Sequence, residues 1–589
     1  MRHIHEISAT LDTSGYKREK TPISLMKLVS CLVILLTCYI VITPLFMLLY
    51  SSVGSAKGKL PFESFSFSLA NYAEALGNPA FLKIVMNSLY FTAGSMAIGI
   101  SLAVVLAWIL ERTDMPGKTV IYGLIMIPMA IPNMIYAISW TQLMDSKIGM
   151  LNQLIRPLFG LETGPFSIYT LGGMIFVQGI HMVPTALLMI AATFATMDPT
   201  LEEQSALCGK GMMTTIRRIS LPILKPSLLA AIIYFAVVAI ETFEIPATLG
   251  LTARTPVLAT QIYWATHPAS GKLPDYGVAS ALGVILLVFA LVLISIYQRS
   301  TRNAEKYTTI TGKAYRPKQL ELGKWKPAAF IFVWLFIILT VFAPFLTLLW
   351  TSLHEFYVPF SWTGLQSVSA NAYRAVLQRP DLPMVAWNTV LMTVASGMLT
   401  VLMATLIGWI VVRGPFSRRT RQLVDAVSFI PQAVPAVVIG LSLMFLYIRF
   451  PLPIYGTIVI LIIGMITKYL AFGSRTMISA QLQISKELEE ASLISGASWS
   501  RTMRKVLMPL LTPAILNCFI WIAVHAMREL SIVIMLYSPK TLVLSTTVWN
   551  LWEGGWTAEA SVLGVFMIVL LGLLFFGGQV LVRRLTGTR

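Results

Sequence analysis

The sequence predicts an all-α integral membrane protein of about twelve transmembrane helices, arranged as two parallel six-helix repeats. Three observations predict this fold class. Of the 589 residues, 56% are hydrophobic and only 12% are charged, and the mean hydropathy is +0.75. No single soluble core could bury so much apolar surface. Apolar runs of spanning length recur along the chain, and one polar motif occurs in both halves.

The apolar runs locate the predicted membrane spans. A run of about 20 residues can cross roughly 30 Å of hydrocarbon. The first half has six candidates, near residues 27–52, 86–110, 119–144, 173–195, 228–250 and 278–297. The second half has six more, near residues 327–352, 387–412, 423–448, 456–478, 514–537 and 560–582. Both halves therefore cross the membrane in the same direction, as in a parallel repeat.

Shared landmarks support the duplication. Residues 127–132 in the third span and 430–435 in the ninth each contain two prolines. Asn87-Ser88 near the start of the second span corresponds to Asn388-Thr389 near the start of the eighth. The paired prolines predict bent helices, which could serve either a solute pathway or simple packing.

Basic residues predict the orientation. Most of the Lys and Arg residues fall in the two terminal tails and in the loops on the same side, so we expect both termini in the cytoplasm of a multi-pass protein of the bacterial inner membrane. The net charge of +18 then reflects topology. Because no soluble module combines basic and aromatic residues, nucleic acid is not an expected partner. The first apolar run is long enough to span and is expected to be retained.

The repeated polar motif is the most specific feature. Each copy has a pair of acids, then a glycine and then a proline, all at the same spacing. The first copy contains Glu202, Glu203, Ser205, Gly209 and Pro222, and the second contains Glu489, Glu490, Ala491, Gly496 and Pro509.

The first copy also shows how such a loop should fold. Asp198 as a possible N-cap, Pro199 at the first helical position and acids in the first turn predict a short helix. Gly209 and Gly211 are expected to turn the chain with positive φ. A short helix fixed between two spans suits the transfer of force from a docked soluble protein. An interfacial helix without a partner is the alternative.

This motif resembles the EAA loop of ABC importer permeases. Glu203, Gln204 and Ser205 take the Glu-Ala-Ala places in one copy, and Glu490, Ala491 and Ser492 take them in the other. The resemblance implies the type I permease fold, with each EAA loop acting as a coupling helix on a cytoplasmic ATPase. Two loops imply two copies of that ATPase subunit, which would hold the ATP and Mg.

No phosphate-binding loop is found in the chain, so we expect a permease subunit and not an enzyme, with no cofactor of its own. The lipid bilayer and a periplasmic or extracellular solute-binding protein are the other implied partners. The expected domains are a first permease domain at 1–298, a basic cytoplasmic linker at 299–326 and a second permease domain at 327–589. Their EAA loops are expected at about 196–227 and 483–514.

Charges inside the spans are candidates for the translocation pathway, since such residues are costly in a membrane. Glu241 and Glu244 are predicted on one face of the fifth span, and His525, Arg528 and Glu529 on one face of the eleventh. Alternatively, Glu241 or Glu244 pairs with Arg528 and holds the halves together. Three further charged or polar residues are interpreted as packing or snorkelling side chains: His181, Lys468 and Arg475.

The transported solute is predicted from resemblance. Residues 240–250 and 526–531 are similar to those of fused ferric-iron permeases. Glu241, Glu244 and Glu529 offer oxygen ligands, which Fe(III) prefers, as weak and transient metal candidates. They would equally suit a polyamine. Related permeases for 2-aminoethylphosphonate, sulfate or thiamine are further alternatives. More remote are a secondary transporter of the major facilitator type and a membrane enzyme, for which no clustered catalytic residues are evident.

Overall fold

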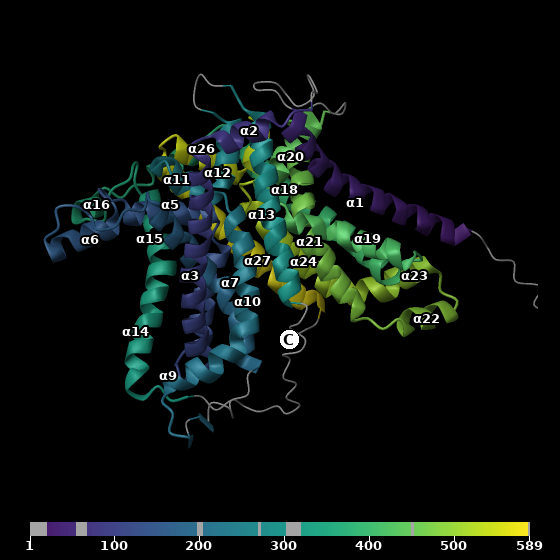
Figure 1. The fold of residues 1–589 in the computed structure, drawn as a ribbon, viewed down its shortest axis with the longest axis horizontal. Helices are drawn as coiled ribbons and strands as arrows, with labels where there is room; N and C mark the ends of the chain where they lie inside the picture. The colour runs from purple at the N-terminus through teal and green to yellow at the C-terminus, as the bar shows by residue number, and fades with distance from the viewer. Residues whose placement is uncertain are drawn as a thin grey trace, which may run out of the picture.

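A computed structural model describes residues 21–54, 67–196, 204–205, 207–268, 273–301, 320–448 and 453–586. Within these ranges the regular structure is helical, apart from an isolated β-bridge between Thr113 and Leu320 (Figure 1). The all-α prediction is therefore confirmed.

The first half contains short surface helices beside its long ones. In order they are α1 (Thr21–Gly54), α2 (Ala70–Gly77), α3 (Phe81–Arg112), α4 (Lys118–Met126), η1 (Ile127–Ala130), α5 (Asn133–Met144), α6 (Met150–Phe159), α7 (Leu171–Thr196), α9 (Met212–Thr215), η2 (Ile216–Ser220), α10 (Leu221–Glu241), α11 (Glu244–Ala253), α12 (Leu258–Thr266) and α13 (Tyr276–Thr301).

The second half repeats this order with shorter loops in places. Its helices are η4 (Gly323–Trp325), α14 (Lys326–Ile337), η5 (Ile338–Phe342), α15 (Ala343–Ser352), α16 (Trp362–Gln366), α17 (Asn371–Leu377), α18 (Leu382–Arg413), α19 (Arg418–Phe429), η6 (Ile430–Ala433), α20 (Ala436–Ile448), α21 (Ile458–Leu482), α22 (Glu487–Ile494), α23 (Trp499–Thr502), η7 (Met503–Leu507), α24 (Met508–Arg528), α25 (Val533–Leu536), α26 (Leu544–Glu553) and α27 (Thr557–Thr586).

The number of membrane spans agrees with the sequence. Among the residues with described positions, nine helices are long and apolar enough to cross a bilayer, and three bent helix pairs raise the number to as many as twelve. The bent pairs belong to the third, fifth and ninth predicted spans.

The third and ninth spans bend much more sharply than proline kinks. The chain turns by 102° between α4 and α5, and by 109° between α19 and α20. At each corner the residue before the second proline, Ile131 or Val434, is extended, with ψ of 128° and 117°. A residue before proline avoids the helical region because the proline ring would clash with its backbone. The second proline therefore ends the first helix outright.

Proline also shapes three widened helical turns. The π-helices η2, η5 and η7 each end two residues before a proline, at Pro222, Pro344 and Pro509. A helical proline clashes with the carbonyl four residues earlier and cannot bond to it. A wider turn moves that carbonyl aside, which explains why these helices continue through a proline.

The fifth and eleventh spans are broken near their ends, which corrects the prediction of continuous helices there. α10 ends at Glu241, and Thr242 is extended (ψ 124°) before α11 begins. α24 ends at Arg528, and Glu529 has the same conformation (ψ 124°). In the first half, Pro246 could not donate to the Thr242 carbonyl, so a continuous helix would lose that bond.

The two halves exchange their first helices. Val33 and Val41 of α1 pack in one apolar cluster with Ile407 and Leu470 of the second half. In return, Phe336 of α14 lies in a cluster with residues of α3 and α4. Figure 1 shows α1 beside α19 on one flank and α14 beside α3 on the other. Each half is therefore completed by a helix from its neighbour.

The end of the linker is fixed to the first half. The Asp114 carboxylate accepts hydrogen bonds from the Lys326 ammonium at 2.8 Å and from the Leu322 amide at 3.1 Å. These contacts hold the pKa of Asp114 below its usual value, first through the Lys326 bond. The central part of the predicted linker, residues 302–319, lies outside the described residues. The bonds at Asp114 hold the start of α14 next to the loop that follows α3.

Candidate functional site

A cavity of about 260 Å³ lies where the broken fifth and eleventh spans meet the corners of the third and ninth. Its wall contains three carboxylates, two cations and a histidine, together with aromatic side chains. The ionisable residues are Glu241, Glu244, Lys468, His525, Arg528 and Glu529. The five pathway candidates named from the sequence are thus brought together, although they do not lie on two continuous helix faces.

Glu529 is the most heavily bonded acid in the cavity. Its carboxylate lies 3.3 Å from the Lys468 ammonium and accepts a 2.9 Å hydrogen bond from the Tyr469 hydroxyl. The backbone carbonyl of Glu529, just after the end of α24, accepts a 2.9 Å hydrogen bond from the Ser545 hydroxyl. A buried charge needs such partners, because unpaired it is very costly. Lys468 therefore belongs to the site and does not snorkel, which corrects the interpretation from sequence.

Glu244 joins the two halves in an unexpected way. Its carboxylate accepts a hydrogen bond of 3.3 Å from the Leu530 amide, one of the backbone groups freed by the break after α24. The Arg528 guanidinium instead donates to the Met129 carbonyl at the corner of the third span. Among the residues with described positions, the predicted ion pair between Arg528 and Glu241 or Glu244 does not form. Lys468 and Glu529 form the ion pair of this cavity.

Glu241 differs from the other two acids. Glu244 and Glu529 are buried, each with 6% exposure. Glu241 is more exposed and lines the cavity, and no side chain or backbone group in the described part of the chain donates a hydrogen bond to it. A carboxylate without a partner is available to a solute.

Aromatic rings cover one wall of the cavity. His525 stacks on Trp521 with 3.7 Å between ring centroids, and Trp521 stacks on Phe472 at 3.6 Å. The Nδ1 atom of His525 lies 2.8 Å from the Trp521 carbonyl. These stacked rings hold one another in place and line the cavity beside the acids.

The acids do not form a ready-made metal centre. Over the described ranges, no group of three or more His, Cys, Asp or Glu residues is positioned to hold a metal ion. The suggestion that Glu241, Glu244 and Glu529 contact a metal only weakly and transiently stays a prediction.

Corresponding positions in the two halves carry different charges. Glu241 is the last residue of α10, and Arg528 is the last residue of α24. His181 of α7 corresponds to Lys468 of α21. His181 contacts Tyr136 ring to ring at 5.0 Å, and its buried Nε2 atom has no hydrogen-bond partner among the described residues. The cavity is therefore built from duplicated positions but is chemically asymmetric.

The EAA loops, by contrast, have nearly the same geometry. In the first, the Ser205 and Thr215 hydroxyls lie 2.7 Å apart, and in the second the Ser492 and Thr502 hydroxyls lie 2.8 Å apart. Gly209 has a φ value of 68°, as the sequence predicted, and Gly496 at the same place in the second loop has a φ value of 77°. Gly211 does not adopt positive φ, so that part of the expectation was wrong.

Both loops end their short helix in the same way. The amide after each glycine bonds back five residues, from Lys210 to Ser205 and from Ala497 to Ser492, at 3.1 Å in each case. This pattern caps the last carbonyls of a helix that ends in a left-handed residue. Glu202 and Glu203, like Asp198 and Pro199, lie outside the described residues.

Each loop presents an exposed apolar side chain just before its glycine. Leu207 is 87% exposed and Ile494 is 86% exposed. Glu490 is also exposed, whereas Glu489 forms an ion pair with Arg413 at the end of α18. Figure 1 shows α9 and α22 on the same side of the molecule, at opposite flanks. Ala491 is exposed on α22. Pro222 and Pro509 are exposed in the first turns of the following helices, α10 and α24.

Comparison with known proteins now identifies the fold. The model of the family described as "Binding-protein-dependent transport system inner membrane component" matches residues 95–306 and again residues 404–587. The chain belongs to this family. Two copies of the permease unit are thus fused in one polypeptide, as the repeated loops predicted.

Several permeases resemble the chain along most of its length. It is 28% identical to the ferric transport system permease protein FbpB of Actinobacillus pleuropneumoniae over 87% of this chain and 73% of that protein. It is 28% identical to putative ferric transport system permease protein FbpB 1 of Haemophilus influenzae, over 78% of this chain and 71% of that protein. The putative 2-aminoethylphosphonate permease PhnV of Salmonella paratyphi A is 26% identical, over 34% of this chain and 76% of that protein.

A solved bacterial ABC transporter that imports the acidic polysaccharide alginate is 16% identical, with a TM-score of 0.36, over 50% of this chain and 99% of that chain. The relatives named above are permease subunits of transporters and not enzymes, and this multi-pass chain is an ABC importer permease.

Sequence reasoning missed Lys468 and Tyr469 as members of the permease cavity. The match of Lys468 to His181 was visible, but its contact with Glu529 depends on how α21 and α24 pack.

Proposed function

We propose that this permease is driven by two copies of a cytoplasmic ATPase docked on its two EAA loops, and that it imports ferric iron. The proposal places both termini and both loops in the cytoplasm. A solute-binding protein delivers the solute to the opposite face. ATP and Mg are held by the ATPase subunits.

The single observation that carries the coupling proposal is the matched geometry of the two loops. Each has an exposed leucine or isoleucine, a left-handed glycine, a Ser–Thr hydrogen bond and a π-turn leading into a spanning helix. A rigid element that leads directly into a spanning helix can transmit a push from a docked protein to the cavity. Leu207 and Ile494 supply the apolar anchors that protein interfaces need at their centre.

Replacing both anchors tests the docking. The Leu207→Glu, Ile494→Glu double variant should lose the ATPase subunit on co-purification and lose solute uptake in proteoliposomes. Leu158→Glu is the control, because Leu158 is 78% exposed but lies on α6, away from the loops. Retention of the ATPase by the double variant, together with unchanged uptake, would contradict the proposal.

Ferric iron is supported by the two similar permeases named for ferric transport and by the chemistry of the cavity. Both cavity cations are engaged, Lys468 by Glu529 and Arg528 by the Met129 carbonyl, whereas Glu241 is without a donor among the described residues. A carbonyl is neutral and leaves the charge of Arg528 in place, but the wall holds three carboxylates against these two cations. The net charge of the cavity is therefore negative, which favours a cationic solute over a phosphonate. Oxygen ligands also suit a hard trivalent ion.

The solute is tested by reconstitution with the ATPase and the cognate binding protein. Uptake of radiolabelled Fe(III) should require ATP and should not be reduced by excess 2-aminoethylphosphonate. Glu241→Gln should slow iron uptake while the ATPase still co-purifies. Uptake of 2-aminoethylphosphonate or a polyamine in place of iron would overturn the assignment but leave the coupling proposal intact.

A further inference from the structure

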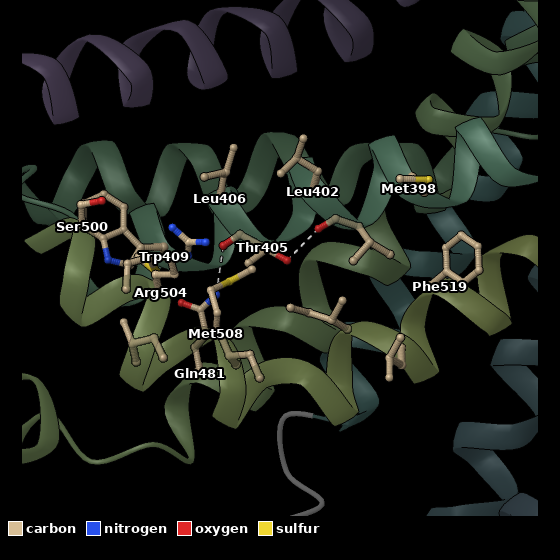
Figure 2. Close-up of a pocket in the computed structure, with 16 residues that line it drawn as sticks. Met398, Leu402, Thr405, Leu406, Trp409, Gln481, Ser500, Arg504, Met508 and Phe519 are labelled. Carbon is tan, nitrogen blue, oxygen red and sulfur yellow. Dashed lines mark hydrogen bonds between the residues drawn. The ribbon is translucent and has the colours of Figure 1, made fainter. Parts of the chain in front are cut away.

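A groove of about 620 Å³ lies between α18 and α24, in the second half and outside the central cavity (Figure 2). Along most of its length the lining is apolar. Leu402 and Met398 come from α18, and Phe519 comes from α24. At the other end, Figure 2 shows Arg504, Ser500 and Trp409 gathered together. The groove therefore has one cationic end and one apolar end.

The apolar end opens toward lipid. Trp387, Val390, Val394, Met398 and Leu402 are 40% to 65% exposed and recur every three or four residues along α18. Residues with that spacing share one helix face. An exposed apolar stripe on a spanning helix is solvated by hydrocarbon. Because Met398 and Leu402 belong to both the stripe and the groove, acyl chains of the bilayer can reach the groove directly.

The polar end carries a cation that no described residue neutralises. Arg504 is exposed and lies in η7, the widened turn that joins the second EAA loop to α24. Over the described ranges it forms no ion pair with an acid. The Gln481 amide, another polar group of the groove, is already bonded, since it donates to the Thr405 carbonyl at 3.0 Å. The guanidinium is therefore the group that would select the head of a ligand.

The first half has a different side chain at the base of the corresponding surface. Phe194 takes the place of Gln481 and is a core residue with 1% exposure. Arg217 and Trp108 take the places of Arg504 and Trp409. Arg217 is therefore an arginine at the duplicated position with a different neighbour, and it serves as a matched internal control.

We propose that this groove binds one anionic phospholipid from the leaflet on the EAA-loop side. The phosphate lies at Arg504, where a guanidinium can form two parallel hydrogen bonds. One acyl chain follows Leu406, Leu402 and Met398 toward Phe519. The volume lies within the range of ligand pockets, and the shape matches an amphiphile. The bound lipid bridges α18 and η7, and thereby steadies the turn that links the second EAA loop to the cavity.

Native mass spectrometry of the full chain tests the site. The permease is released from nanodiscs containing equal amounts of phosphatidylglycerol and phosphatidylcholine, and retained lipids are counted. Wild type should retain one phosphatidylglycerol in preference. Arg504→Ala should reduce that preference roughly fivefold, the effect of one basic residue at an anionic lipid surface. Arg504→Lys should keep most of it, and Arg217→Ala should not change it.

A second variant tests the apolar end without touching the charge. Leu402→Trp should fill the groove and displace the retained lipid, whereas Val390→Trp, on the same stripe but outside the groove, should not. Equal retention of the two lipids by wild type, or equal losses in the Arg504 and Arg217 variants, would overturn the proposal. These readouts do not depend on the solute or on the ATPase.

Discussion

The EAA loops and the central cavity are both made from duplicated segments. The two loops have nearly the same geometry in both halves, whereas the cavity residues differ between the halves. The Ser205–Thr215 and Ser492–Thr502 distances differ by only 0.1 Å, from 2.7 to 2.8 Å. Near the cavity, the same duplication places Glu241 opposite Arg528 in the alignment of the halves. The loops keep their symmetry and the cavity has lost it.

This difference follows from what each region would contact under the proposed function. Two identical ATPase subunits would present identical surfaces, so the two loops are under the same constraint. A small solute on the axis between the halves meets both at once and has no such symmetry. The helix breaks at Thr242 and Glu529, with ψ of 124° in each half, show that the backbone of the cavity is still duplicated. Only the side chains have diverged.

Making the cavity symmetric should have the largest effect. Glu241→Arg would place arginines at both equivalent positions, remove the acid without a donor and add a charge to an enclosed site. Iron uptake should fall at least roughly tenfold, which corresponds to about 1.4 kcal/mol of barrier. The ATPase should still co-purify. Unchanged uptake in proteoliposomes would show that charge asymmetry in the cavity has no role.

Releasing one loop should have the next largest effect. Arg413→Ala removes the partner of Glu489 and the 2.9 Å bond to the Ile484 carbonyl, which together hold α22 against α18. ATP-dependent uptake should fall roughly tenfold, because breaking a shielded ion pair leaves one charge uncompensated. Arg413→Lys should recover part of the activity. If the alanine variant transports normally, the ion pair is not needed for coupling.

A smaller and equal effect is expected from the loop hydroxyls. Ser205→Ala and Ser492→Ala each remove one hydrogen bond, with a net value of about 0.5–1.5 kcal/mol. Each should weaken ATPase binding by the same factor of no more than about ten, measured by titrating the ATPase onto permease in nanodiscs. Clearly unequal losses would break the equivalence of the two loops.

The smallest effect is expected where the linker meets the first half. Asp114→Asn removes the ionised acceptor for Lys326 and should lower the melting temperature slightly at neutral pH. The pKa of Asp114 is depressed in the folded state, so its contribution is present above the ordinary pKa of about 3.9 and is lost as pH falls. Wild type and variant should therefore converge in acid. A difference that persists there would point to another cause.

The sequence predicted the parts of the fold that depend on local signals. Apolar run lengths located the spans, and the acid–glycine–proline spacing located both loops. Proline positions predicted bends, but not corners of 102° and 109°. The size of a bend depends on the neighbours that accept the second segment, and these are distant in sequence.

The sequence predicted most of the charged residues that line the cavity, but it did not predict the contacts between them. Glu241, Glu244, Arg528 and Glu529 stood out because charges are rare in apolar spans. The partner of Glu529 was missed because Lys468 could equally have reached an interface. The breaks after α10 and α24 also have no shared local signal, since Pro246 is matched by Val533 in the second half. The exchange of α1 and α14 between the halves was also not predicted, because it depends on tertiary packing and has no local sequence signal.

The exchanged first helices bear on how such a protein could be divided. Severing the chain between α13 and α14 would leave two fragments, each with a bare flank that only the other fragment can cover. Neither fragment would be expected to survive in a bilayer alone, whereas the two made together would interlock. Mutual dependence of this kind would favour pairing of the two different fragments.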